Sequence, residues 1–193
     1  MKRTPTPGPG PAFWREVDFP QIHDEPAGLR AYIERLRAEY QNGDVVHRAF
    51  LFPEPAELRQ RALDAFARDH AFFHCFWHCR SVRAALPYAL HDEEFSAGRP
   101  FEPMTSVELP GQLAGVLARG GAYSRDQPKA REAMALGMDA AEALVAGEFD
   151  GVRVLRSHAP WSRFFQDVAW DHTWIVVQLE RGRIDVLMAT DTD

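Results

Sequence analysis

The densest group of reactive side chains in this sequence lies in the segment DHAFFHCFWHCRSV, near the middle of the chain. The segment places histidines and cysteines at four-residue spacing, at His70, His74, His78, Cys75 and Cys79. Residues four apart lie on the same face of a helix, and two histidines so placed can bind one metal ion. The pattern therefore raises the question of a metal site.

Two features of this segment favour packing over metal binding. A metal site would use His74 and His78, but Cys75 stands where a zinc-protease helix carries its glutamate, and the chain has no second pair of cysteines. Phenylalanine and tryptophan side chains also make this stretch apolar nearly all round. We therefore interpret it as a buried helix with unreactive thiols, and we predict no metal and no cofactor.

A second concentration of functional side chains occupies the last third of the chain. Tryptophans there alternate closely with acids and histidines, and tryptophan beside a carboxylate is typical of a recognition surface, because the ring supplies area and the acid supplies orientation. The predicted binding residues are Trp161, Trp170, Asp171, His172 and Asp191.

The same residues are also compatible with a catalytic role or with a purely structural one. His158, Asp171 and His172 could act as acid–base groups of a small-molecule enzyme or a ligand sensor, since histidine titrates near neutral pH. Alternatively, the tryptophans fill the core and the polar residues lie at the ends of strands. The arrangement of the surrounding elements has to decide among these three roles.

The hydrophobic periodicity predicts the elements that position these residues. Helical patterns with suitable start and stop signals cover residues 28–40, 56–86, 110–121 and 127–149, and one or two helical turns are expected at 161–167. Strand patterns cover residues 44–52 and 151–158, a short strand is expected near 104–108, and a hairpin over 170–191 turns near Arg181 and Gly182.

The hairpin is apolar on both faces, which is typical of strands at the centre of a sheet. Trp174 and Val176 alternate with Ile175, Val177 and Leu179. The predicted fold is therefore α+β, with a mostly antiparallel sheet of three to five strands packed with about four helices. A flexible tail rich in Pro and Gly is expected over residues 1–12, followed by a single domain over 13–193.

Composition narrows the classes of function. The chain has 193 residues and a net charge of −6, which argues against nucleic-acid binding, because phosphates require a basic surface. No apolar run approaches the length of a membrane span. Two cysteines in one segment form no disulfide framework, and the start of the chain lacks the apolar core of a signal peptide, so we expect a cytoplasmic protein.

These observations favour a small acidic binding protein without catalytic activity. Its partner is expected to be a basic protein, as for an inhibitor or an immunity protein. The overall character is similar to that of bacterial immunity proteins, although no motif of such a family is matched, so this is an analogy only. The enzyme or ligand sensor remains the alternative.

Overall fold

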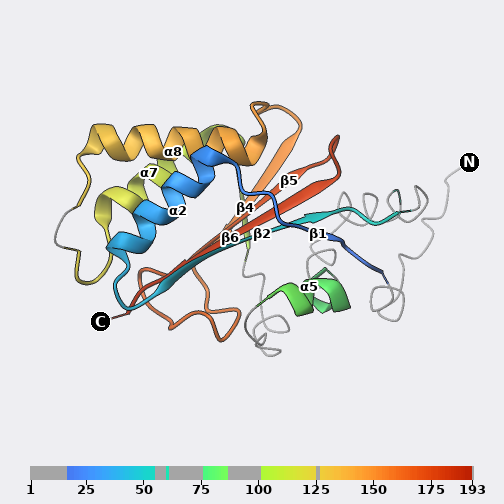
Figure 1. Ribbon diagram of the computed structural model, residues 1–193, viewed down its shortest axis with the longest axis horizontal. Coiled ribbons are helices and arrows are strands. Elements are labelled where there is room, and N and C mark those ends of the chain that lie inside the picture. The colour runs from blue at the N-terminus through green and yellow to red at the C-terminus, as the bar shows by residue number, and fades with distance from the viewer. Residues whose placement is uncertain (1–16, 55–59, 61–75, 87–100, 125–126, 193) are drawn as a thin grey trace, which may run out of the picture.

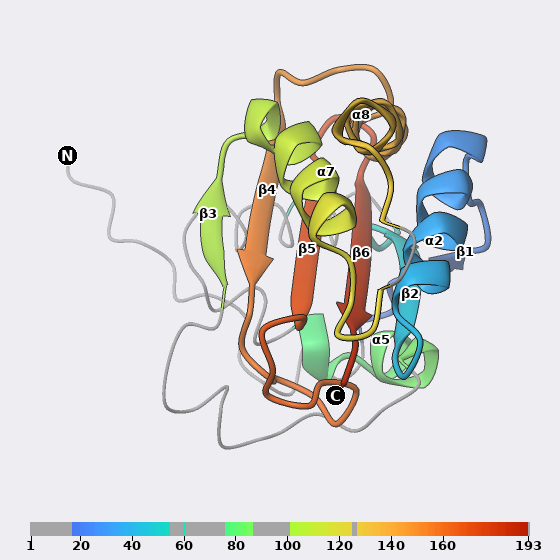
Figure 2. The ribbon, with the colours of Figure 1, turned by 90° about the vertical axis from the view of Figure 1, so that its left-hand side faces the viewer.

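The computed structural model describes residues 17–54, 60, 76–86, 101–124 and 127–192 (Figure 1). These residues form an α+β fold around one antiparallel sheet of six strands, as the sequence pattern predicts apart from a slightly larger number of strands. The strands run in the order β1-β2-β6-β5-β4-β3, which Figure 2 shows across the sheet. Their bounds are Gln21–Ile22 for β1, Asp44–Leu51 for β2, Glu102–Met104 for β3, Val152–Ser157 for β4, His172–Gln178 for β5 and Arg183–Thr190 for β6.

The predicted hairpin, β5 and β6, forms the centre of the sheet. Its register pairs Trp174 with Leu187 and Val176 with Asp185. Every residue of β5 is buried, and its side chains alternate between two hydrophobic clusters on opposite faces. Trp174 and Val176 belong to one cluster, while Ile175 and Val177 belong to the other, which confirms that both faces of the hairpin are covered.

Three helices cover one face of the sheet, as Figure 1 shows. They are α2 (Ala27–Glu39), α7 (Leu109–Arg119) and α8 (Ala130–Val145). All three lie where the apolar periodicity predicts helices, with ends shifted by one to four residues. Gly120 ends α7 with a φ of +67°, a backbone conformation that glycine adopts at little cost. A short 3-10 turn, η1 (Ser106–Glu108), precedes α7 and follows β3, which lies slightly earlier than the strand expected near 104–108.

The opposite face of the sheet is covered by α5 (Arg80–Ala85) and by aromatic side chains. Trp77 packs against Phe76 and Trp161, with ring centroids 4.9 and 4.6 Å apart. The continuous helix predicted over 56–86 lies largely outside the described residues, but within 76–86 it is interrupted. Cys79 has an extended backbone, and α5 begins after it.

The helical turns predicted at 161–167 are wrong. This segment forms turns, and Asp167 has a left-handed backbone with a φ of +60°. The backbone N–H groups of Gln166 and Val168 donate to the carboxylate of Asp171 instead of to carbonyls one turn earlier. The local competition of an aspartate side chain with helical hydrogen bonds accounts for the difference.

No helix within the described part of the chain has the length and apolar character needed to cross a membrane.

Candidate functional site

Two of the three predicted acid–base residues meet at the end of the sheet where the last residues of β6 lie. His158 follows β4 directly and His172 begins β5, and antiparallel pairing of these strands brings the two together. Four other side chains lie around them, from the ends of α2, α7, β6 and the loop before β5. We call this group the carboxyl-end cluster; it consists of Tyr40, Arg119, His158, Asp171, His172 and Asp191.

The two imidazoles are joined through their Nδ1 atoms, which are 3.0 Å apart. Nδ1 of His158 also lies 3.1 Å from the backbone oxygen of Asp171. A carbonyl oxygen only accepts hydrogen bonds, so His158 carries its proton on Nδ1 and His172 accepts with its own Nδ1. His158 is an exposed residue, whereas His172 is 4% exposed, and this hydrogen-bond pattern leaves the proton of neutral His172 on Nε2.

His172 remains neutral across the physiological range. Burial, the adjacent His158 and the cation of Arg119 lower the pKa of His172 to about 3. Its ring also stacks on Trp174, with centroids 5.5 Å apart. The expected titration of His172 near neutral pH is therefore wrong, because the imidazole has been removed from water and placed beside positive charge.

Asp171 has a structural role in this arrangement. Its carboxylate is completely buried and accepts hydrogen bonds from the hydroxyl of Thr190 at 2.6 Å and from two backbone N–H groups of the preceding loop. Only the backbone oxygen of Asp171 contacts His158. The carboxylate thus ties the loop to β6 and does not polarise either imidazole.

Asp191 ties three segments together in the same way. It is fully buried, and its two oxygens accept hydrogen bonds from the backbone N–H groups of Asn42 at 2.9 Å and Ala122 at 2.8 Å. These donors follow α2 and α7, so one carboxylate holds both connections against the end of β6. Neither Asp191 nor Asp171 presents its charge to a partner in this conformation.

The two tryptophans predicted to bind a partner differ in position. Trp161 is completely buried, and its indole N–H donates to the hydroxyl of Thr173 at 2.9 Å. Trp170 is half-buried and packs against the hydrophobic cluster that contains Trp174 and Val176, between the sheet and the three helices. Of the five predicted binding residues, Trp170 alone reaches the surface, so a contact with a partner would depend on Trp170 and its loop. The binding role remains a prediction.

Tyr40 and Arg119 complete the cluster, and sequence reasoning missed both. The Tyr40 hydroxyl is buried and has no hydrogen-bond partner among the described residues. Burial and the negative charge of Asp191 raise the pKa of Tyr40 well above its ordinary value. These residues lie far from the C-terminal third in sequence and carry no local motif, so only the packing of α2 and α7 on the sheet brings them here.

A second buried polar group lies near the other end of β6, and the sequence analysis did not identify it either. Asp185 is fully buried and accepts two hydrogen bonds of 2.7 Å from the guanidinium of Arg183. Nε2 of His47 lies 3.0 Å from the same carboxylate. A signal was present in the sequence, because Asp185 interrupts the apolar strand pattern IDVLMA and His47 interrupts VVHRAF. Bidentate pairing to Arg183 compensates this buried charge.

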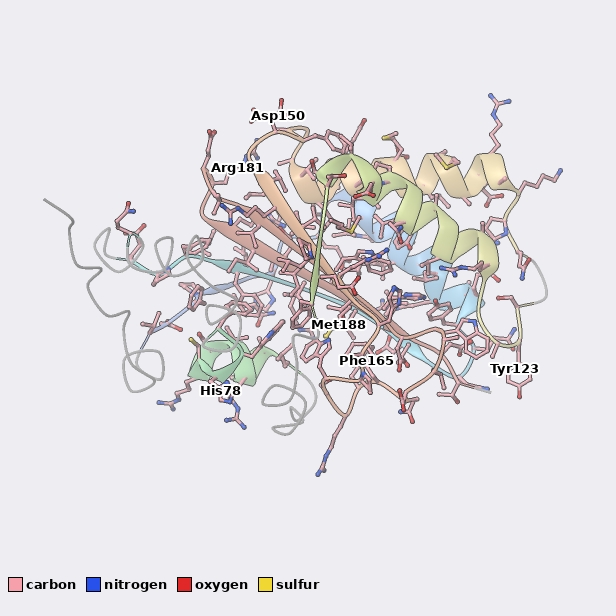
Figure 3. All side chains as sticks on the ribbon, turned by 180° about the vertical axis from the view of Figure 1, so that it is seen from behind. His78, Tyr123, Asp150, Phe165, Arg181 and Met188 are labelled. Carbon is pink, nitrogen blue, oxygen red and sulfur yellow. The ribbon has the colours of Figure 1, made fainter. Side chains whose placement is uncertain are left out.

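Only one of the two histidines of the metal alternative lies in the described part of the chain. His74 lies outside it, while His78 is half-buried and precedes α5 (Figure 3). Among the described residues, no three His, Cys, Asp or Glu side chains are placed to hold one metal ion.

Among the members of the carboxyl-end cluster, His158 and Arg119 are the exposed residues, and the Nδ1 atom of His158 is held beside a backbone carbonyl. Its neighbours are neutral or engaged in structural hydrogen bonds. No protein-family model, no curated protein and no solved structure matches this chain.

Proposed function

We propose that this chain is a small acidic binding protein that engages a basic protein, in the manner of an inhibitor or an immunity protein, and that it has no catalytic activity. The proposal includes a cytoplasmic location, and a bacterial origin by analogy of overall character alone. Its net charge of −6 supports it, since a field of one sign attracts a partner of opposite charge.

The observation that carries the proposal is a contrast between two sets of carboxylates. Asp171, Asp185 and Asp191 are fully buried and engaged in internal hydrogen bonds, which leaves them no role as acid–base groups. Glu148, Asp150 and Glu180, in contrast, are exposed and gather at the opposite end of the sheet from the carboxyl-end cluster. Exposed, unpaired charge contributes to recognition at little cost in folding stability.

Affinity capture with the full chain tests this proposal. The immobilised protein is exposed to a soluble extract of its source cells, beside a control resin that carries an unrelated protein of similar net charge. We expect one basic protein to be retained at a ratio near one to one, to co-elute with the purified chain in gel filtration, and to bind more weakly as salt is raised. Retention of nothing in stoichiometric amount, or of an acidic protein only, contradicts the proposal.

The alternative is an enzyme or ligand sensor. One feature favours it, namely the hydrogen bond that orients the imidazole of His158. His158 is an exposed residue, and a histidine whose Nδ1–H is held by a carbonyl can act as a general base through its other ring nitrogen. Hydrolysis of p-nitrophenyl acetate by the full chain and by His158→Gln provides a direct test. We expect the full chain to be no faster than free imidazole at equal concentration. A larger rate that disappears in His158→Gln supports the enzyme.

A further inference from the structure

Two methionines on α8 form an exposed apolar pair. The large hydrophobic side chains that are exposed among the described residues are Val107, Tyr123, Met134 and Met138. Met134 and Met138 are 48% and 39% exposed and lie four positions apart, which places them side by side on one face of the helix. Single apolar residues are common on protein surfaces, whereas adjoining ones form a patch that another molecule can cover.

The packing of α7 against α8 defines the side of the helix pair on which these methionines lie. The helices touch where a Cβ atom at Gly137 would lie 2.7 Å from backbone atoms of Pro110 and Ala114. They run in opposite directions, because Tyr123, which follows α7, and Asp150, which follows α8, lie at opposite ends of the pair in Figure 3. In two antiparallel helices, residues that follow the contact line by the same angle lie on the same side of the pair.

On that side, α7 carries no side chain that could cover the methionines. Gly111 and Gly115 each lie one position after a contact residue of α7, and Met138 lies one position after Gly137. Gly111 is exposed and Gly115 is half-buried, and a Cβ atom at either glycine would meet nothing within 4 Å. The methionine pair therefore stands beside an open part of the α7 surface.

Opposite charges lie at the two ends of the methionine pair. Arg131, Met134, Met138 and Glu142 follow one another at intervals of three, four and four positions, so they form one stripe along α8, which we call the α8 stripe. All four residues are exposed, and within the described part of the chain neither charged side chain has an ion pair or a hydrogen bond. The two charges are about 16 Å apart along the helix axis.

The α8 stripe is complementary to itself under a two-fold rotation. Arg131 and Glu142 are equally far from the point between Leu136 and Gly137, and one methionine lies on each side of that point. A two-fold axis through this point lays the α8 helix of a second copy antiparallel to the first. Arg131 of each copy then lies beside Glu142 of the other copy, and the methionines meet between these charges. Every contact occurs twice in such an interface.

The charge pattern also decides which kind of partner fits. A uniformly basic surface would be attracted by Glu142 but repelled by Arg131, and an acidic surface would meet the reverse, whereas a second copy pairs both charges. Methionine side chains are flexible enough to adapt to each other in the centre. A contact limited to one helix of each copy buries less than the roughly 800 Å² per partner of a stable complex, so the association is expected to be weak.

We propose that two copies of this chain form a weak two-fold dimer through the α8 stripe. This inference goes beyond the proposed function and does not depend on it, because a basic partner would use a different surface. Sedimentation equilibrium of the full chain, from micromolar to millimolar concentration, tests it. We expect a reversible equilibrium between monomer and dimer. A chain that remains monomeric at millimolar concentration, or that forms open-ended assemblies, overturns the proposal.

Charge exchange tests the predicted pairing directly. Arg131→Glu and Glu142→Arg each replace two attractive contacts with two repulsive ones, and each is expected to raise the Kd of the dimer by at least about tenfold. The double variant Arg131→Glu/Glu142→Arg restores both pairs with their charges exchanged, so its Kd should return to within about threefold of the unmodified value. If the double variant does not recover the dimer, the pairing is wrong.

The same variants separate specific pairing from an effect of net charge. The chain is acidic, so Glu142→Arg lowers the repulsion between copies, and Arg131→Glu raises it. A stronger dimer in Glu142→Arg therefore attributes association to net charge and overturns the proposal. Glu34→Arg on α2 and Arg83→Glu on α5 make the same changes at exposed positions outside the stripe and should change the Kd by less than about twofold. Equal effects in these controls also contradict it.

The apolar part of the stripe has its own test. Met134→Gln and Met138→Gln keep the length of the side chain and the net charge, and each is expected to raise the Kd several-fold, because apolar area buried twice in the dimer is lost. An unchanged Kd in both variants places the interface elsewhere and overturns the proposal. Urea midpoints close to that of the unmodified chain confirm that the variants retain the fold, since all of these positions are exposed.

Discussion

His158 and His172 share a hydrogen bond between their Nδ1 atoms although they lie fourteen positions apart in the chain. Pairing of β4 with β5 brings them together, and the buried carboxylate of Asp171 holds the loop that connects them. One imidazole is exposed and the other is buried. This relationship makes the stability of the protein sensitive to pH.

The pKa of His172 predicts a loss of stability as the pH falls. Its pKa is about 3 in the folded state and about 6.5 in the unfolded state, so below pH 6.5 the unfolded chain binds a proton that the folded chain does not. The free energy of unfolding should therefore decrease by about 2 kcal/mol between pH 7 and pH 5 on account of this residue. Urea unfolding at intervals of half a pH unit measures the change.

Variants isolate the contribution of His172. In His172→Gln this part of the pH dependence should disappear, while His23→Gln, which changes an exposed imidazole, controls for the loss of one histidine. If the slope between pH 7 and pH 5 is the same in His172→Gln as in the unmodified chain, the buried neutral imidazole is not the cause.

Removal of the Asp185 carboxylate should destabilise the protein strongly. Asp185→Ala leaves the guanidinium of Arg183, which is 15% exposed, without its bidentate partner, and removes the carboxylate that His47 contacts. The expected loss is about 3 kcal/mol, measured by urea unfolding. Asp24→Ala removes the other, exposed partner of Arg183 and should cost less than about 1 kcal/mol. Equal losses in the two variants would show that the buried pair has no special role.

Gly137 should be required for the contact between α7 and α8. A Cβ atom at this position would lie 2.7 Å from the backbone nitrogen of Ala114 and from the backbone oxygen of Pro110. Gly137→Ala is therefore expected to destabilise by about 1–3 kcal/mol, although alanine is the better helix former. A Cβ atom at Gly115 would have no neighbouring atom within 4 Å. Gly115→Ala should therefore raise the free energy of unfolding, by up to about 1 kcal/mol. Thermal unfolding of both variants shows whether the close contact between α7 and α8 or the helix propensity of alanine has the larger effect on stability at Gly137.

Cys79 should be protected from thiol reagents in the native state. Its side chain is completely buried in the cluster that contains Trp77 and Val82. In a Cys75→Ser background, where Cys79 is the only thiol, we expect 5,5′-dithiobis(2-nitrobenzoate) to react at least about a hundredfold more slowly than in urea, because reaction requires local opening. Fast labelling of the native protein would contradict the packing role assigned to this segment.

Much of the fold could be predicted from local pattern. The double-sided apolar alternation of 172–190 predicted a central hairpin, and the periodic stripes of α2, α7 and α8 predicted helices in the right places. The pattern failed where a distant or nearby side chain competes for the backbone, as Asp171 does with the segment 161–167. It also failed at Cys79, where the chain turns so that residues on both sides enter the core.

At the candidate site, local sequence pattern predicts the positions of some residues but not their burial or charge. The predicted strand over 151–158 and the predicted hairpin over 170–191 already place His158, Asp171 and His172 at strand ends, whereas the pairing of β4 with β5 is seen only in the structure. Only the tertiary structure decided that Asp171 and Asp191 are buried anchors, that His172 is neutral, and that Tyr40 and Arg119 lie beside them. Burial and charge depend on what packs around a side chain. Tyr40 and Arg119 follow or end helices that lie more than fifty residues before His172, and Thr190 reaches Asp171 from β6.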